Sequence, residues 1–297
     1  MGRSNRNTPK ADSNRAEKLA RRREAQAAAS VIARPFEGLA AEGDLVAMRE
    51  FVPSATAPLP VKGTDRKFFV ATVLPGAVNA IVREEGDDVV AYVALQAQSR
   101  GSDPATDLAG SIEWALESKV GESLPRAQAG SKPLAELIDA AEPLEITVHD
   151  TFDWWFNSEI PAGSEAAVVV ERANAAIMPS ARVEGLDAAW WVDAGEKAHI
   201  RWVRKEDEDA LMLALARVHA AGGLTLGEGS RYAGSFRTDG LLVPVFDLER
   251  TRPAQDWAAG TAEFGERLDK ALAATDELTV DERRARDGLR GRQITLR

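Results

Sequence analysis

Thirteen consecutive residues, LEITVHDTFDWWF (144–156), bring one histidine, two aspartates and two tryptophans together. Within them, His149, Asp150 and Asp153 form an HD-x-x-D pattern. Imidazole and carboxylate groups hold catalytic cations and activate their bound water, so this pattern is typical of a metal-assisted hydrolase. Such a site needs further ligands, and the chain offers only three histidines and no cysteine to supply them. We therefore expect no metal site here.

The same stretch has a structural interpretation. Alternation along LEITVH places its apolar side chains on one face of a strand and His149 on the other. Asp150 is then a residue at the end of the strand that binds nearby amides. Trp154 and Trp155 are then core residues, or residues that pack between two halves of the protein.

A second candidate site lies in residues 227–240, where glycine and serine predict a long surface loop. Backbone amides together with Ser230, Arg231 and Arg237 are able to hold a phosphate group. An enzyme that acts on a phosphate or another small molecule would need this loop and His149 to meet in one pocket. The alternative is a surface loop with solvated arginines. The sequence contains no GxGxxG motif, P-loop or G-x-S-x-G motif.

The net charge of −10 is unevenly distributed. Residues 1–30 carry +5 and residues 280–297 carry +3, which leaves −18 for residues 31–279. We interpret residues 1–30 as a basic arm, disordered or helical only with a partner, that contacts RNA, a ribosome or DNA. The acidic body is then a surface for a protein partner, and the alternative is a solvated arm with no partner. The cations expected to make the contact are Arg15, Lys18, Arg21, Arg22 and Arg23.

The composition is that of a globular protein, with 44% hydrophobic and 28% charged residues in a chain of 297. The absence of cysteine excludes disulfides and thiolate zinc sites, and it favours a reducing compartment. No apolar run reaches the roughly 18 residues of a membrane span, and the N-terminus lacks the apolar core of a signal peptide. We expect a cytoplasmic protein with no membrane partner and no cofactor.

Hydrophobic periodicity and turn residues predict an α+β fold, with antiparallel sheets and helices packed on one face. Helix starts are predicted at Asp103-Pro104 and at Asp207, and Asp44 is expected to cap a short helix. The predicted strands are 67–74, 77–82, 89–96, 144–148, 166–170, 188–193, 198–203 and 241–248. The predicted organisation is the arm at 1–30, a first α+β half at 31–150, a second half at 151–279 and an arginine-rich tail at 280–297.

The two halves are weakly alike. KFFVATV and NAIVRE in the first half match AWWVDAG and HIRWVRK in the second, and LEITVHD matches LLVPVFD. This comparison aligns Asp150 with Asp247 and puts His149 at the place of Phe246. It suggests an internal duplication, although short apolar strands resemble one another by default.

Three stretches, RPFEGLAAEGDLVAMREFVPSATAPL, FFVATVLPGAVNAI and SRYAGSFRTDGLLVPVFDL, resemble an actinobacterial family of unknown function. The resemblance covers about Arg34 to Leu248. Members carry labels that relate them to the SecA preprotein translocase or to topoisomerase II, but this chain has no Walker loop and no toprim signature. Some members have a cysteine-rich zinc module at the N-terminus, which this chain lacks. The family has no established catalytic residues, so the resemblance implies none here.

These observations favour a non-enzymatic adaptor or accessory protein whose arm binds RNA, a ribosome or DNA. The alternative is an enzyme acting on a phosphate or small molecule through residues 227–240 and His149, Asp150 and Asp153. The convergence of these two segments separates the two hypotheses.

Overall fold

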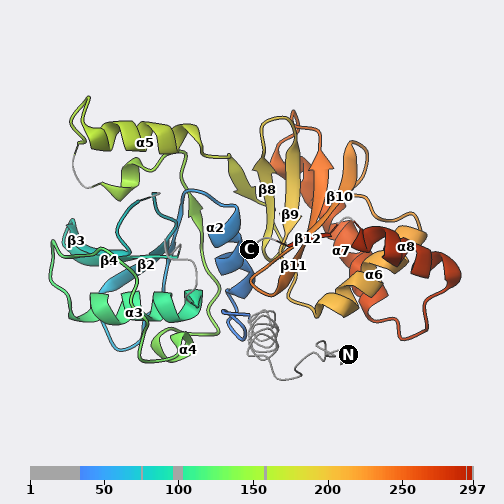
Figure 1. The fold of residues 1–297 in the computed structure, drawn as a ribbon, viewed down its shortest axis with the longest axis horizontal. Helices are drawn as coiled ribbons and strands as arrows, with labels where there is room; N and C mark the ends of the chain where they lie inside the picture. The colour runs from blue at the N-terminus through green and yellow to red at the C-terminus, as the bar shows by residue number, and fades with distance from the viewer. Residues whose placement is uncertain (1–33, 75, 96–102, 157–158, 292, 296–297) are drawn as a thin grey trace, which may run out of the picture. The chain divides into compact units, whose positions relative to one another are not determined.

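The computed structural model describes residues 34–74, 76–95, 103–156, 159–291 and 293–295. Residues 35–297 form one compact unit, whereas the predicted basic arm lies outside the described residues. In the described ranges the chain forms seven α-helices and two six-stranded sheets (Figure 1). The predicted α+β fold is therefore confirmed.

The first sheet has the strand order β5-β3-β4-β2-β1-β6. Every neighbouring pair is antiparallel except β2 and β4, which are parallel. The turn between β3 and β4 contains Gly86, whose φ of 63° explains why glycine stands there. The strands are β1 (Ala55–Pro58), β2 (Lys67–Ala71), β3 (Ala80–Glu85), β4 (Asp88–Ala94), β5 (Ser123–Leu124) and β6 (Thr147–Val148).

Helices α3 (Pro104–Glu117) and α4 (Leu134–Leu137) pack together on the side of the first sheet where α3 contacts β3 and β4. The predicted start of α3 is confirmed, since the carboxylate of Asp103 accepts a hydrogen bond from the Ala105 amide. Leu108 and Ile112 form the buried face of this helix. The opposite side of the sheet is covered by a short 3₁₀ helix at Asp153–Trp155.

The second sheet has the order β12-β10-β11-β9-β8-β7, and only β10 and β12 are parallel. A two-residue hairpin turn at Asp239-Gly240 joins β10 to β11, and both of its residues have positive φ. The strands are β7 (Ser180–Arg182), β8 (Ala189–Asp193), β9 (Ala198–Trp202), β10 (Ser230–Thr238), β11 (Leu241–Leu248) and β12 (Gln293–Thr295).

Helix α6 (Glu208–Ala220) packs against α7 (Ala258–Leu272), α8 (Val280–Arg290) and β11. The predicted start of α6 is confirmed, because Asp207 accepts a hydrogen bond from the Ala210 amide. A 3₁₀ turn at Ala254–Trp257 leads into α7. These helices and the second sheet enclose a core around Phe246 and Phe264.

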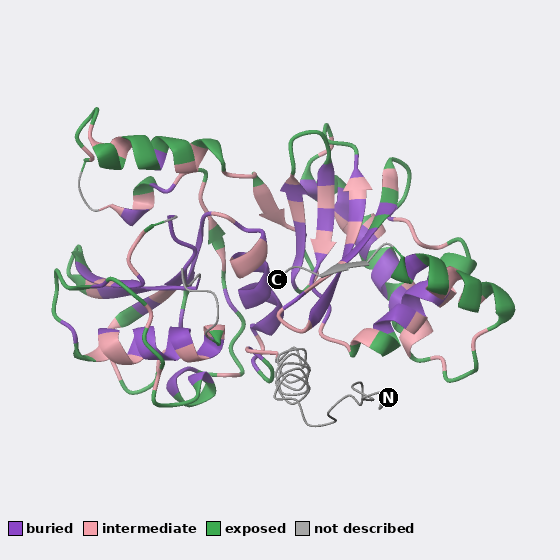
Figure 2. Cartoon of the chain, in the orientation of Figure 1, coloured by how far each residue is buried: buried purple, intermediate pink, exposed green. Residues whose placement is uncertain are grey.

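Helix α2 (Glu42–Glu50) joins the two halves, since it lies between the two sheets (Figure 1). It belongs to one hydrophobic cluster that contains Val70 and Val93 of the first sheet as well as Trp190 and Val243 of the second. Figure 2 shows this helix largely in the buried colour. The two halves therefore share a core instead of forming independent domains.

Three sequence-based assignments that concern helices are wrong. Residues 166–170 lie in helix α5 (Glu165–Ala175) and not in a strand, because the Ser164 hydroxyl caps the helix and only Val170 of that run is buried. Residues 280–290 form α8 with a complete capping box and are not a tail. Asp44 lies inside α2 instead of capping it, and its side chain is buried.

The strand equivalences suggested by the internal comparison do not match the sheets. LEITVHD ends in the two-residue edge strand β6, whereas LLVPVFD is the central strand β11. The sheets do share a strand order, β1-β2-β4-β3 and β8-β9-β11-β10. The directions differ, because β2 and β4 are parallel while β9 and β11 are antiparallel. The two halves therefore correspond in order but not in direction.

The longest helix in the described ranges is α7, with 15 residues. No described helix combines the length and apolar composition needed to cross a membrane.

Candidate functional site

An open groove of about 690 Å³ lies beside the first sheet, between the start of β2 and the chain that follows α4. This volume falls within the usual range of ligand-binding pockets, which is about 300–1,000 Å³. We call this feature the acidic groove. Its lining residues are Pro58, Leu59, Pro60, Val61, Arg66, Lys67, Phe68, Phe69, Asp139, Glu142, Pro143 and Glu145.

The groove contains apolar side chains that are partly or fully exposed to solvent. Phe69 is partly buried and stacks on Tyr92 of β4, with ring centroids 5.3 Å apart. Pro58 and Pro143 are exposed, and Pro60 is partly exposed. Rings of proline and phenylalanine are rigid, so they present contact area at little cost in conformational entropy.

Three carboxylates stand along one wall of the groove, at Asp139, Glu142 and Glu145, and all three residues are exposed. Asp139 accepts a hydrogen bond from the Ala141 amide, 3.0 Å away. In the part of the chain that the structure describes, none of the three forms an ion pair.

The two cations that line the groove are engaged elsewhere. Arg66 donates to the backbone oxygens of Ala115 and Ser118 at the end of α3, the second at 2.9 Å. Lys67 pairs with Asp88 across the β2–β4 pair. The carboxylates therefore dominate the local charge of the groove.

His149 lies elsewhere, at the edge where β6 meets β1. Its Nε2 is 2.9 Å from the hydroxyl oxygen of Thr56, and its ring stacks on Trp154 with centroids 5.0 Å apart. Trp154 in turn donates from Nε1 to the hydroxyl of Ser54, which donates to the Thr151 carbonyl. His149 is thus part of a network that fastens the Trp154 segment to β1.

Burial lowers the pKa of His149, and Asp150 opposes that effect. Asp150 itself is exposed. Asp153 opens the 3₁₀ helix, and its carboxylate accepts a hydrogen bond from the side-chain amide of Asn174 in α5, 3.1 Å away. These contacts give His149 and Asp153 structural partners on two different elements.

Trp154 and Trp155 pack on the first sheet, although residues 151–279 were predicted to belong to the second half. Trp155 is buried and Trp154 packs beside it, against Tyr92. Arg83 of β3 is also buried, lies 4.4 Å above the Tyr92 ring, and donates to the backbone oxygens of Trp154 and Trp155. This arginine holds the 3₁₀ helix on the sheet.

Residues 230–238 form strand β10, so the prediction of a continuous loop over 227–240 is wrong. The Ser230 hydroxyl accepts from the Leu226 amide and donates to the Gly227 carbonyl. Arg231 pairs with Asp247 and Arg237 with Glu208. These three side chains stabilise the turn and the sheet around them.

The structure does not bring the two predicted segments together. His149 borders the first sheet, whereas Ser230 and Arg231 belong to the second and line a separate pocket of about 330 Å³ with His219. The hydrogen-bond partners of His149 and Asp153 all come from the first half or from α5. The geometry therefore gives no support to an enzyme built from both segments.

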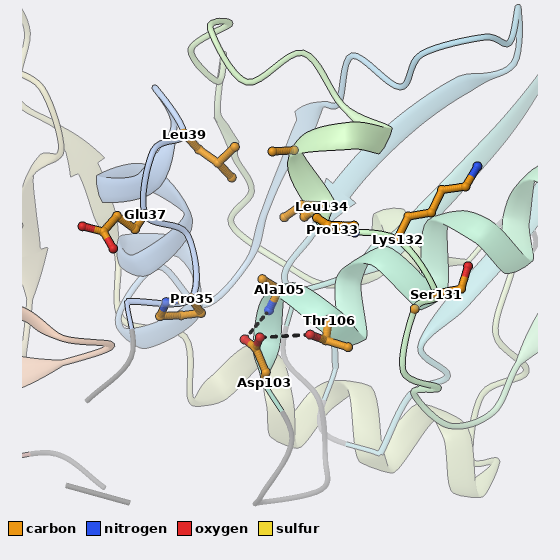
Figure 3. Close-up of a pocket in the computed structure, with 12 residues that line it drawn as sticks. Pro35, Glu37, Leu39, Asp103, Ala105, Thr106, Ser131, Lys132, Pro133 and Leu134 are labelled. Carbon is orange, nitrogen blue, oxygen red and sulfur yellow. Dashed lines mark hydrogen bonds between the residues drawn. The ribbon is translucent and has the colours of Figure 1, made fainter. Parts of the chain in front are cut away.

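A further hollow of about 470 Å³ adjoins the start of α3 (Figure 3). The carboxylate of Asp103 lies in it and accepts hydrogen bonds from the Ala105 amide and the Thr106 hydroxyl, at 3.1 and 2.9 Å. This carboxylate is satisfied as a helix cap, so the hollow has a structural explanation.

A charged cluster on β9, β10 and β11 was not predicted from the sequence. The carboxylate of Asp247 lies 2.6 Å from Lys197 Nζ, 3.1 Å from Arg231 and 3.5 Å from His199. Burial raises the pKa of Asp247, but the hydrogen bonds from Lys197 and Arg231 outweigh it and hold this pKa below its usual range. Burial is the main reason that the pKa of His199 is also lowered. The Asp247 carboxylate therefore binds side chains of the neighbouring strands.

The arm residues Arg15, Lys18, Arg21, Arg22 and Arg23 lie outside the described residues. Within the described ranges, no group of three or more His, Asp or Glu side chains is placed to hold a metal ion. The groove itself was missed because its signals, three prolines and three spaced acids, are divided between residues 58–69 and 139–145.

The fold and the groove define an α+β protein with two sheets joined through one shared helix. The chain belongs to the family of unknown function DUF5926, whose sequence model matches residues 35–297. This match begins at Pro35 and includes α8 and β12. No curated protein and no solved structure matches the chain.

Proposed function

We propose that this protein is a non-enzymatic adaptor or accessory protein in the cytoplasm. Its basic arm binds a polyanion, which is RNA, a ribosome or DNA, and its acidic body binds a protein. The observation that carries the proposal is the separation of charge, with +5 over residues 1–30 and −18 over residues 31–279.

The ion pairs of the body support this division of roles. Its arginines are matched by carboxylates, as in the pairs Arg49–Asp239 at 2.7 Å and Arg250–Asp193 at 2.9 Å. Others donate to backbone oxygens, as Arg267 does to Thr225. A cation that is already paired adds little attraction for a phosphate backbone, so the arm is the main source of positive potential.

The absence of cysteine supports the cytoplasmic location. The structural roles of His149, Asp153, Ser230, Arg231 and Arg237 support a protein without catalysis, because each has a partner within the fold.

The test uses the full-length chain and a 20-nucleotide single-stranded RNA labelled with fluorescein. We expect binding that weakens steeply as salt rises, because lysine and arginine contacts release counterions from the RNA. Replacing all five arm cations with glutamine is expected to abolish most of this binding and to flatten its salt dependence. These cations are Arg15, Lys18, Arg21, Arg22 and Arg23.

The control removes four arginines from α8, one cation fewer than the arm variant loses, and their side chains bond to neighbouring acids or carbonyls. This control keeps wild-type affinity if the arm is the contact. Equal losses in both variants, or unchanged binding by the arm variant, contradict the proposal. The four arginines are Arg283, Arg284, Arg286 and Arg290.

A further inference from the structure

We propose that the acidic groove binds an extended basic peptide segment of a protein partner, in which lysine or arginine alternates with proline or an aliphatic residue. This inference rests on the protein-binding part of the proposed function. It names the surface of the body that makes the contact and the chemistry of what it contacts.

The groove is open enough to admit an extended chain. It is open to solvent, and its residues come from two stretches that run along it, 58–69 and 139–145. The apolar contacts are made by rigid rings at Pro58, Pro143 and Phe69. Grooves lined by such rings favour proline-containing segments, because those segments are already extended before they bind.

The charge of the groove selects for cations. Asp139, Glu142 and Glu145 are exposed, and no described cation pairs with them. The nearby Arg66 and Lys67 are bound to the end of α3 and to Asp88, so they do not neutralise the wall. A lysine or arginine of the partner supplies the missing positive charge.

The backbone of β1 explains why side chains must provide the contact. The edge strand β6 pairs with β1 at Ala55 and Thr56, and farther along the same edge the Asp139 amide donates to the Pro60 carbonyl at 2.9 Å. The position between these two contacts that would face an added strand is Pro58. Proline has no N–H to donate, so strand addition at this edge is disfavoured.

The test measures fluorescence anisotropy of labelled twelve-residue peptides with the full-length protein. The probe is a peptide of three Lys-Pro-Leu-Pro repeats. One comparison peptide replaces each lysine with glutamate, and another has Lys-Gly-Ser-Gly repeats, which keep the charge without the apolar residues. We expect the first probe to bind and both comparison peptides to bind at least about tenfold more weakly, because charge and apolar contact both contribute.

The groove variant is Asp139→Asn with Glu142→Gln and Glu145→Gln. The control variant removes three exposed carboxylates elsewhere, at Glu184, Glu196 and Glu277, and changes the net charge equally. The groove variant is expected to lose about tenfold in affinity, since exposed ion pairs contribute modestly and add up over three sites. The control variant is expected to stay within about twofold of the wild type.

Several results overturn the inference. These are no binding of the Lys-Pro-Leu-Pro peptide, equal binding of the glutamate peptide, or equal losses in the two variants. Self-association of the protein that the groove variant abolishes also overturns it, because the occupant is then a second copy. The RNA measurement with the arm variant is independent of all these results, so failure of the groove is distinguishable from failure of the proposed function.

Discussion

The guanidinium of Arg182 lies 2.8 Å from the carboxylate of Asp44, and this contact joins β7 of the second half to α2 of the first. The Asp44 side chain is only 2% exposed, whereas that of Arg182 is 34% exposed. Lys205 adds a second link, because its Nζ donates to the Ala40 carbonyl at 3.0 Å. The two halves are therefore connected by polar contacts as well as by the shared core.

The charge on Asp44 makes stability depend on pH. Burial raises the pKa of Asp44, and Arg182 opposes that effect. Because its folded pKa is above the unfolded value of about 3.9, the folded chain binds the proton more tightly. The resulting stabilisation is complete below about pH 3.9 and is lost as pH rises through the folded pKa. We expect the stability of Asp44→Asn relative to wild type to increase between about pH 4 and pH 7.

Urea unfolding at a series of pH values measures this difference in free energy. Glu184→Gln, at an exposed carboxyl, controls for the loss of one charge. A difference that stays constant or declines as pH rises would show that Asp44 is not destabilised by ionisation in the folded protein.

The two partly buried histidines produce the opposite slope. Burial is the first cause of the lowered pKa at both His149 and His199. The unfolded chain therefore binds more protons, so stability is full above about pH 6.5 and is lost as pH falls below it. We expect the double variant His149→Gln with His199→Gln to show a shallower decline in unfolding free energy on acidification. His219→Gln, at an exposed histidine, is the control for the loss of an imidazole; equal slopes in all three proteins contradict the prediction.

Close packing at Gly43 makes α2 sensitive to one methyl group. A Cβ placed on Gly43 would lie 2.7 Å from the Cβ of Ala188. We expect Gly43→Ala to lower the free energy of unfolding by about 1–3 kcal/mol, because the overlap outweighs the better helix propensity of alanine. A Cβ placed on Gly288 in α8 would meet no atom within 4 Å. Gly288→Ala should therefore raise the free energy of unfolding by about 0.5–1 kcal/mol, because alanine has the better helix propensity. Urea unfolding of both variants tests the pair, and a stabilised Gly43→Ala protein refutes the packing argument.

Arg83 is expected to be the most costly arginine to replace among those discussed. It is buried, pairs with Glu85 at 2.5 Å and donates to Trp155 at 2.8 Å. Arg83→Gln should lower the unfolding free energy by about 2–4 kcal/mol, since Glu85 and the carbonyls lose their donor. Arg250→Gln removes an exposed pair and should cost less than about 1 kcal/mol. Similar losses in thermal or urea unfolding would mean that Arg83 does not anchor the 3₁₀ helix.

Local signals predicted the elements whose ends are set by a single side chain. Asp103 and Asp207 cap α3 and α6 because a carboxylate satisfies free amides wherever the helix lies in the fold. The failures occurred where short-range signals conflict. Three consecutive valines favour a strand at 168–170. These residues form part of helix α5 instead, because the Ser164 side chain caps the start of that helix. In β10, Gly234 and a register shift interrupt the alternation that marks a strand.

Local sequence signals predicted the candidate site less well than they predicted the helices. Residue types alone indicated His149 and Arg231, which the structure uses for internal contacts. The acidic groove joins residues about 80 positions apart, so no local pattern predicts it. Periodicity, capping residues and charge thus determined the α+β class, several helix starts and the uneven distribution of charge along the chain. Tertiary packing decided which polar side chains are already satisfied and which described carboxylates stand exposed without an ion pair, because only the fold brings distant partners within hydrogen-bonding distance.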